Sequence, residues 1–167
     1  MLLRRSLVAV LALAAATPAS AHGPTGHGPS GGRTGDPGQV TRTIEVTATD
    51  NAFSLKALDV RDGETVRFVV RNTGIDPHEF IIGTIAEHAM HRRMMKEMID
   101  RQKKDGHVHS MTSMEHEGGV WIEPGKTASF VWTFARTADL EFACNIPGHY
   151  EHGMKGAITF VGSGASP

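Results

Sequence analysis

Apolar and polar residues alternate along several short segments of this chain. Alternation with a period of two over four to eight residues is typical of β-strands with one buried face. Residues 64–71 show it clearly, because Val66, Phe68 and Val70 fall on one side of an extended backbone. The other strands are predicted at Ile44, Val46 and Ala48; at Phe53, Leu55 and Leu58; at Ala128, Phe130, Trp132 and Phe134; at Leu140, Phe142 and Cys144; and at Ala157, Thr159 and Val161.

A different pattern interrupts the strands between residues 85 and 104. This segment has no Gly or Pro and is rich in helix-forming residues, which predicts one helix. Turn-forming residues such as those at 61–64 separate the strands. Short strands joined by such turns, with one helical interruption, predict an all-β sandwich that carries a helical insert at about residues 84–117.

The first 21 residues have the pattern of a cleaved signal peptide. Arg4 and Arg5 precede an apolar run at 7–16, and small residues follow at 19–21. The apolar run is too short to span a bilayer comfortably. We therefore expect a periplasmic protein with no stable membrane insertion.

The remaining chain divides by composition into one domain and two tails. Gly, Pro and His dominate the segment after the signal peptide, and small residues dominate the last few positions. The predicted parts are a flexible tail at 22–39, the sandwich domain at 40–162 and a second flexible tail at 163–167.

Charge and cysteine content argue against two kinds of protein, nucleic-acid binders and disulfide-stabilised domains. The formal net charge of −1 becomes −3 when the two signal-peptide arginines are removed, which is too mild to indicate nucleic-acid binding. The single cysteine excludes an internal disulfide in what we expect to be a monomer. A lone thiol in an oxidising compartment is protected if a metal occupies it.

Metal-ligand residue types gather where the predicted strand at 140–144 ends. Cys144, His149 and Met154 follow one another at intervals of five residues, and His78 follows an earlier strand and turn. A thiolate, two imidazoles and a weak thioether are the ligands of a blue-copper site. The alternative is that Cys144 is a small buried hydrophobic residue and the others are ordinary loop residues. The coincidence of four matching ligand types favours copper.

The helical insert is rich in further copper-binding residue types. Residues 84–117 contain six of the eight methionines and five of the ten histidines. Met90, Met94 and Met98 recur every four residues, which also fits an apolar stripe that packs on the sandwich. Thioethers suit Cu(I) and imidazoles suit Cu(II), so the segment fits copper in either oxidation state.

Cleavage after residue 21 would add another candidate, because the new terminal amine and the His22 imidazole can chelate Cu(II) together. The alternative is that His22 only begins the flexible tail. The hypothesis of accessory copper binding covers His22, His88, His91, Met94, Met95, Met98, His107, His109, Met111, Met114 and His116.

Two segments carry a family resemblance. CNIPGHYEHGMKG resembles the ligand loop of cupredoxins, in the longer spacing of auracyanin and rusticyanin, and NTGIDPHEFIIG looks like the segment that supplies their first histidine. With the Met/His-rich insert, residues 40–161 look most like the periplasmic copper-tolerance cupredoxins of the CopI type. The resemblance implies a Greek-key β-sandwich with one type 1 copper, held strongly by His78, Cys144 and His149 and weakly by an axial Met154.

One residue departs from the family pattern. Many cupredoxins follow the first histidine with Asn or Ser, which helps tie the two ligand segments together, whereas this chain has Glu79. Groups behind the ligands tune a copper site, so the departure bears on its colour and potential.

Enzyme motifs are incomplete in the sequence. Ile82 stands where the zinc-protease motif H-E-x-x-H needs its second histidine. His107 and His109 form one His-x-His element, but multicopper oxidases need several such elements. A Cys–His nucleophilic pair would lack an orienting third group, and a zinc site would not need Met154.

The favoured interpretation is therefore a copper-tolerance or copper-homeostasis protein that binds copper and exchanges one electron. A plain periplasmic electron carrier is the alternative, and a Cu(I) oxidase is a weaker one, so we expect no enzymatic activity. The expected partners are copper ions and a periplasmic redox partner or a copper exporter or oxidase.

Overall fold

The computed structural model describes residues 30–105 and 117–162 of the 167-residue chain. The predicted signal peptide and His22 lie outside the described residues. So do five of the accessory candidates, namely His107, His109, Met111, Met114 and His116.

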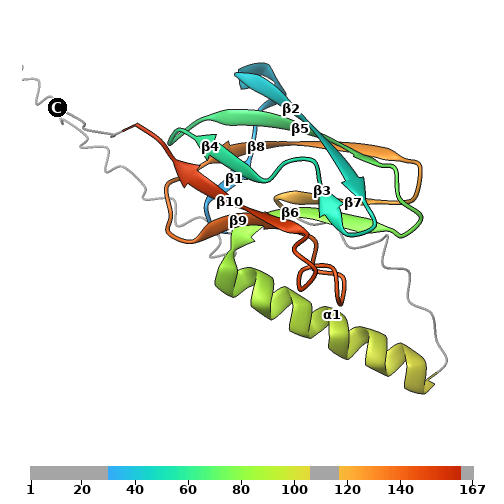
Figure 1. The fold of residues 1–167 in the computed structure, drawn as a ribbon. Coiled ribbons are helices and arrows are strands. Elements are labelled where there is room, and N and C mark those ends of the chain that lie inside the picture. The colour runs from blue at the N-terminus through green and yellow to red at the C-terminus, as the bar shows by residue number, and fades with distance from the viewer. Residues whose placement is uncertain (1–29, 106–116, 163–167) are drawn as a thin grey trace, which may run out of the picture.

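Two five-stranded sheets pack face to face (Figure 1). The sheets and the helical insert confirm the predicted all-β sandwich. The first sheet has the order β1 (Gly32–Thr34), β8 (Thr127–Phe134), β5 (Thr65–Asn72), β2 (Arg42–Thr49) and β3 (Ala52–Phe53). The second has the order β4 (Ala57–Val60), β10 (Lys155–Phe160), β9 (Leu140–Ala143), β6 (His78–Thr84) and β7 (Gly119–Ile122), and a 3-10 helix spans Pro37–Gln39.

Phenylalanines from both sheets fill the space between them. Phe80 of β6 stacks on Phe142 of β9 with ring centroids 5.1 Å apart, and Phe53 of β3 meets the edge of Phe80 at 5.1 Å. Phe68 of β5 lies 5.4 Å from Phe80. Each such ring removes a large apolar area from water, which is the main stabilising term of the core.

The last strand has the opposite register from the one its sequence suggests. Ala157 and Thr159 are exposed, whereas Gly156 and Ile158 are buried. The core register follows from a close approach: a Cβ at Gly156 would collide with the ring of Phe142. The small residue at 156 therefore faces inward, a choice that alternation alone does not reveal.

The folded part also begins earlier than predicted. Gly32–Thr34 pairs antiparallel with β8, inside the range expected to be a flexible tail. The strand lies close to the indole of Trp132, whose Nε1–H donates to the Gly31 carbonyl at 3.3 Å. A Cβ at Gly32 would collide with that indole, so the glycine content that predicted flexibility serves close packing instead.

The predicted helix is present as α1 (Ile85–Asp105). It begins with a capping box, in which the Glu87 N–H donates to Thr84 Oγ1 at 3.3 Å and the Thr84 N–H donates to Glu87 Oε2 at 2.7 Å. α1 contacts β6 and β9 and lies outside the sandwich (Figure 1).

The face that α1 presents to the sandwich is not the expected methionine stripe. Met90 and Met94 are 52% and 54% exposed, while His88 and Met95 are buried. The interpretation of the stripe as core packing is therefore wrong for Met90 and Met94. None of the helices in the described residues is both long enough and apolar enough to cross a membrane.

Candidate metal centre

Two of the four predicted ligands are brought together by the pairing of β6 with β9. These strands run antiparallel with Ile81 opposite Ala143, so the start of β6 lies near the end of β9. His78 is the first residue of β6, and Cys144 directly follows β9. Both side chains are fully buried.

His149 reaches the same point from the loop between β9 and β10. Gly148 has a φ of 93°, a left-handed conformation that favours glycine, and the His149 N–H donates to the Ile146 carbonyl at 3.0 Å. The Met154 N–H donates to the His149 carbonyl and the Cys144 N–H donates to the Met154 carbonyl, each at 3.0 Å. These bonds close the loop, and the Met154 side chain is fully buried.

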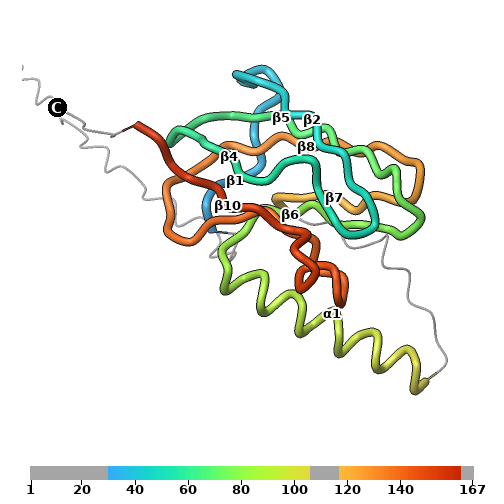
Figure 2. The backbone as a smooth tube through the Cα atoms, in the orientation of Figure 1, coloured from blue at the N-terminus to red at the C-terminus, as the bar shows by residue number. Residues whose placement is uncertain are grey.

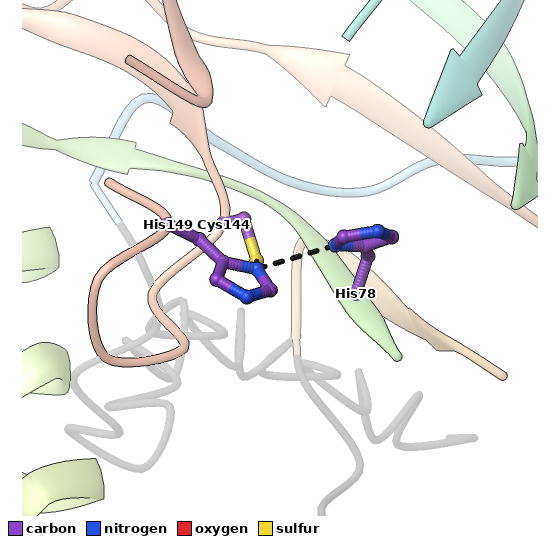
Figure 3. Close-up of side chains that lie close together, drawn as sticks. All are labelled: His78, Cys144 and His149. Carbon is purple, nitrogen blue, oxygen red and sulfur yellow. Dashed lines mark hydrogen bonds between the residues drawn. The ribbon is translucent and has the colours of Figure 1, made fainter. Parts of the chain in front are cut away.

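The side chains of the three predicted strong ligands, His78, Cys144 and His149, converge (Figure 3). Nδ1 of His78 lies 3.3 Å from Nδ1 of His149, and Sγ of Cys144 lies 3.4 Å from the same His149 nitrogen. One ligand atom from each of the three residues lies within 4.8 Å of the other two. His149 is partly exposed, so the site sits at one end of the sandwich and is open on the His149 side.

The segment that leads into His78 is held by a buried asparagine. Asn72 Nδ2 donates to the carbonyls of Asp76 at 2.7 Å and Ile122 at 3.1 Å, while its Oδ1 accepts from the Gly74 N–H at 2.9 Å. Asp50 also accepts from the Asp76 N–H, and this bond is the main reason that the pKa of Asp50 is lowered. The sequence reasoning missed Asn72, whose only local signal was its place at the start of an Asn-Thr-Gly turn.

Burial controls the protonation of the three ligands. It raises the pKa of the Cys144 thiol to about 12. The N–H of Glu79 donates to Sγ at 3.4 Å and opposes this shift, but its effect is smaller than that of burial. Burial also lowers the pKa of His78, with a further contribution from the nearby His149. The pKa of His149 is lowered as well, mainly by burial, although Asp76 opposes the shift. Both imidazoles are therefore neutral and the thiol is protonated near pH 7.

This donor set fits a copper ion. Nδ1 of His149 lies within hydrogen-bond distance of both His78 Nδ1 and Cys144 Sγ, so three atoms able to bind a metal face one another. A bound cation would satisfy all three at once, with the thiol giving up its proton. Two imidazoles, one thiolate and a nearby buried methionine are the ligand types of a type 1 copper site.

The described accessory candidates lie away from these three ligands, along α1. His88 is buried, and its Nδ1 lies 3.0 Å from Asn145 Oδ1. His91 is partly buried. Met95 is buried, Met94 is exposed and Met98 is partly exposed. Within residues 30–105 and 117–162, the one group of His, Cys, Asp and Glu residues able to hold a metal is the cluster of His78, Cys144 and His149.

The unusual Glu79 links the two ligand segments. Its Oε2 accepts from the Asn145 N–H at 3.2 Å, which joins the residue after His78 to the residue after Cys144. Its Oε1 lies 3.1 Å from His91 Nε2 on α1. The carboxylate thus reaches the ligand loop on one side and the helical insert on the other.

Comparison with known proteins agrees with this chemistry. A family model described as copper binding proteins of the plastocyanin/azurin family matches residues 40–161. A relative from Pseudomonas aeruginosa, named copper-resistant cuproprotein CopI, is 40% identical over 84% of this chain and 88% of its own length. A relative of the same name from Rubrivivax gelatinosus is 39% identical over 76% of this chain and 71% of its own.

Solved structures show the same fold at low identity. Auracyanin B superposes with a TM-score of 0.59 at 19% identity, covering 82% of this chain and 100% of its own. Auracyanin A from Chloroflexus aurantiacus gives a TM-score of 0.53 at 21% identity, covering 71% of this chain and 98% of its own. At these identities the likeness concerns the sandwich alone.

Proposed function

The chain belongs to the plastocyanin/azurin family of copper binding proteins, and from this premise we propose that it is a periplasmic type 1 copper protein that acts in copper tolerance. Copper is its cofactor. The observation that carries the proposal is the convergence of the His78, Cys144 and His149 donor atoms within 4.8 Å of one another.

Each ligand has a distinct part in the proposed site. Cys144 supplies the thiolate, and the Glu79 N–H that points at its sulfur partly offsets the negative charge. The neutral rings of His78 and His149 supply nitrogen lone pairs. Met154 supplies a weak thioether from the buried end of the loop. Copper bound there would exchange one electron between Cu(II) and Cu(I).

The surrounding frame would keep these ligands in place in both oxidation states. His78 and Cys144 are anchored by a paired strand and by the packed core, and the backbone bonds of Met154 close the loop on Cys144 and His149. Packed cores resist small displacements, so ligand rearrangement between the two states is limited.

Two observations favour copper tolerance over simple electron transfer. The curated relatives at 40% and 39% identity carry the name copper-resistant cuproprotein, and the match spans most of each chain. The exposed thioethers of Met90 and Met94 on α1 also fit soft, exchangeable binding of Cu(I), for which an electron carrier has no need.

An electron-carrier role is the second candidate. It is favoured by the partly exposed His149 and by Ile75, which is 83% exposed on the segment that leads into His78. An apolar surface beside a ligand suits brief docking with a redox partner. Oxidation of Cu(I) at the methionine-rich insert is a weaker third proposal.

Copper loading tests the type 1 site. Wild-type protein with one equivalent of Cu(II) should absorb strongly in the visible through thiolate-to-copper charge transfer, and Cys144→Ser should abolish the band.

Met154→Leu should keep copper, shift the band and raise the reduction potential, because a weak donor is lost while side-chain volume is nearly kept. Ile158→Leu, a volume-conserving change at a buried core residue of β10, is the control and should leave colour and potential unchanged. An intense band in Cys144→Ser would contradict the ligand assignment.

A further inference from the structure

The two ligands that come from the sheet have neighbours that face α1. Successive residues of a strand point to opposite sides, so a core-facing ligand is followed by a residue on the outer face. His78 lies on the same side of β6 as the core residues Phe80 and Ile82, which places Glu79 on the other side. Cys144 belongs to the core, and the next residue, Asn145, contacts α1. Each of these two ligands is thus followed directly in the chain by a residue that contacts α1, namely Glu79 after His78 and Asn145 after Cys144.

Both outer-face residues are fully buried and polar. Glu79 and Asn145 are each 0% exposed, because α1 covers this face of β6 and β9. A buried carboxylate is strongly destabilising unless it accepts hydrogen bonds, and Glu79 accepts them from two directions. One partner is the Asn145 N–H at 3.2 Å and another is His91 of α1 at 3.1 Å.

The contact with His91 completes a chain from the helix to the copper ligands. His91 Nε2 meets one carboxylate oxygen of Glu79, and the other oxygen accepts from the backbone next to Cys144. The backbone N–H of Glu79 itself donates to Cys144 Sγ at 3.4 Å. A movement of the Glu79 carboxylate therefore acts on both the sulfur and the loop that follows it.

A second histidine of α1 makes a parallel contact. His88 lies three residues before His91, on a neighbouring position of the same helix face. Its Nδ1 lies 3.0 Å from Asn145 Oδ1, and its Nε2 lies 3.3 Å from the Glu141 carbonyl of β9. The loop between β9 and β10 also lies beside α1 (Figure 2). The Arg92 guanidinium of α1 lies 3.5 Å from the centroid of the Tyr150 ring in this loop.

From this geometry we propose that His91 is a positioning residue for the copper centre, which acts through Glu79 on Cys144 and its loop, with His88 supporting Asn145 from the same helix face. The inference rests on the proposed type 1 site. It gives α1 a role that its composition did not indicate: its inner histidines hold the ligand frame from behind, whereas its methionines at 90 and 94 face solvent.

The reduction potential gives a readout that a purely structural contact would not move in this way. A negative carboxylate behind the thiolate favours the more positive, oxidised ion, so Glu79→Gln should raise the potential. The hydrogen bond from His91 Nε2 holds the Glu79 carboxylate in place and partly offsets its negative charge. His91→Leu should therefore shift the potential in the wild-type background and leave it unchanged in the Glu79→Gln background. His91→Gln can place an amide N–H near the position of Nε2 and should retain most of the wild-type potential.

The metal-free protein offers an independent measurement. Amide hydrogen exchange at Asn145 reports the bond from its N–H to Glu79. His91→Leu should speed this exchange roughly three- to tenfold, the equivalent of one hydrogen bond. Lys96→Ala, on an exposed position of the same helix, is the control and should change neither the exchange rate nor the potential.

The outcomes separate this inference from the proposed function. If wild-type protein shows the intense visible band but His91→Leu shifts the potential equally with and without Glu79→Gln, the inference is overturned and the type 1 site stands. An unchanged potential and an unchanged Asn145 exchange rate in His91→Leu would overturn it too. If the wild type lacks the band, the proposed function itself fails.

Discussion

At the scale of single residues, the chemistry of Cys144 is set by its burial. A thiol with a pKa of about 12 is inert in the metal-free protein, because only the thiolate is a good nucleophile and metal ligand. The neighbouring histidines are neutral near pH 7, since burial lowers the pKa of each. A copper ion is therefore needed to expel the thiol proton, and binding is linked to pH.

We expect copper binding near pH 7 to release about one proton, from Cys144. The two imidazoles release none there, because they are already neutral. Apparent affinity should accordingly rise about tenfold for each pH unit between pH 7 and pH 8. Calorimetry in two buffers of different ionisation enthalpy measures the protons released, and competition with a chelator measures the affinity. Release that persists undiminished in Cys144→Ser would contradict this assignment of the proton.

At the scale of elements, α1 and the ligand loop pack through polar contacts. The inner face of the helix carries His88, which is buried between Asn145 and the backbone of β9. Burial is the main reason that the pKa of His88 is lowered, although the contacts with Glu141 and Asn145 oppose the shift. In the unfolded chain His88 would instead bind a proton near pH 6.5.

This difference predicts a loss of stability in acid. Below pH 6.5 the unfolded state binds more protons at His88 than the folded state does. The contribution of His88 to the free energy of unfolding is therefore fully present above pH 6.5 and falls as the pH drops toward the lower pKa of the folded state. The decline is at most about 1.4 kcal/mol per pH unit for one group.

Urea unfolding of the metal-free protein at pH 8 and pH 5.5 measures the effect. The lowered pKa values of His78 and His149 also make the wild type less stable in acid, so the effect of His88 is measured by comparison with His88→Gln. The free energy of unfolding should fall less between the two pH values in His88→Gln than in the wild type. Equal losses in both proteins would show that His88 does not contribute.

At the scale of the whole molecule, the sandwich and the insert have separable tasks under the tolerance proposal. The sandwich holds one copper between β6, β9 and the ligand loop, and the insert adds soft donors elsewhere. An electron carrier would need the first task only. The segment after α1, residues 106–116, therefore distinguishes the two candidate functions, because it is rich in His and Met.

We expect a variant that replaces His107, His109, Met111, Met114 and His116 to keep the coloured site intact. Its total copper stoichiometry should be lower, and cells that depend on it should be more sensitive to copper. Metal analysis, the visible band and growth on copper measure the three effects. A variant that binds as much copper and protects as well as the wild type would favour the electron-carrier role.

The positions of most strands, the helix and the candidate ligand types could be predicted from the amino-acid sequence. Alternation identified β2, β5 and β8 because the period of a strand and the burial of one face are both local properties. The absence of Gly and Pro located α1 to within one residue of its observed end. The spacing of Cys144, His149 and Met154 predicted a ligand loop, and backbone hydrogen bonds join these three residues in the structure, since a short loop keeps residues that are near in sequence near in space.

Which faces of the elements pack together could not be predicted from the sequence. α1 exposes Met90 and Met94 but buries Met95 with His88, and neither the methionines nor the histidines form a simple apolar stripe. The inner side is chosen by partners distant in sequence, because the buried Glu79 carboxylate and the Asn145 side-chain oxygen lie against His91 and His88. The inward register of Gly156 and the pairing of β1 likewise depend on side chains of other strands, Phe142 and Trp132. Hydrogen-bond satisfaction and close packing are non-local, and so they appear only when the chain is folded.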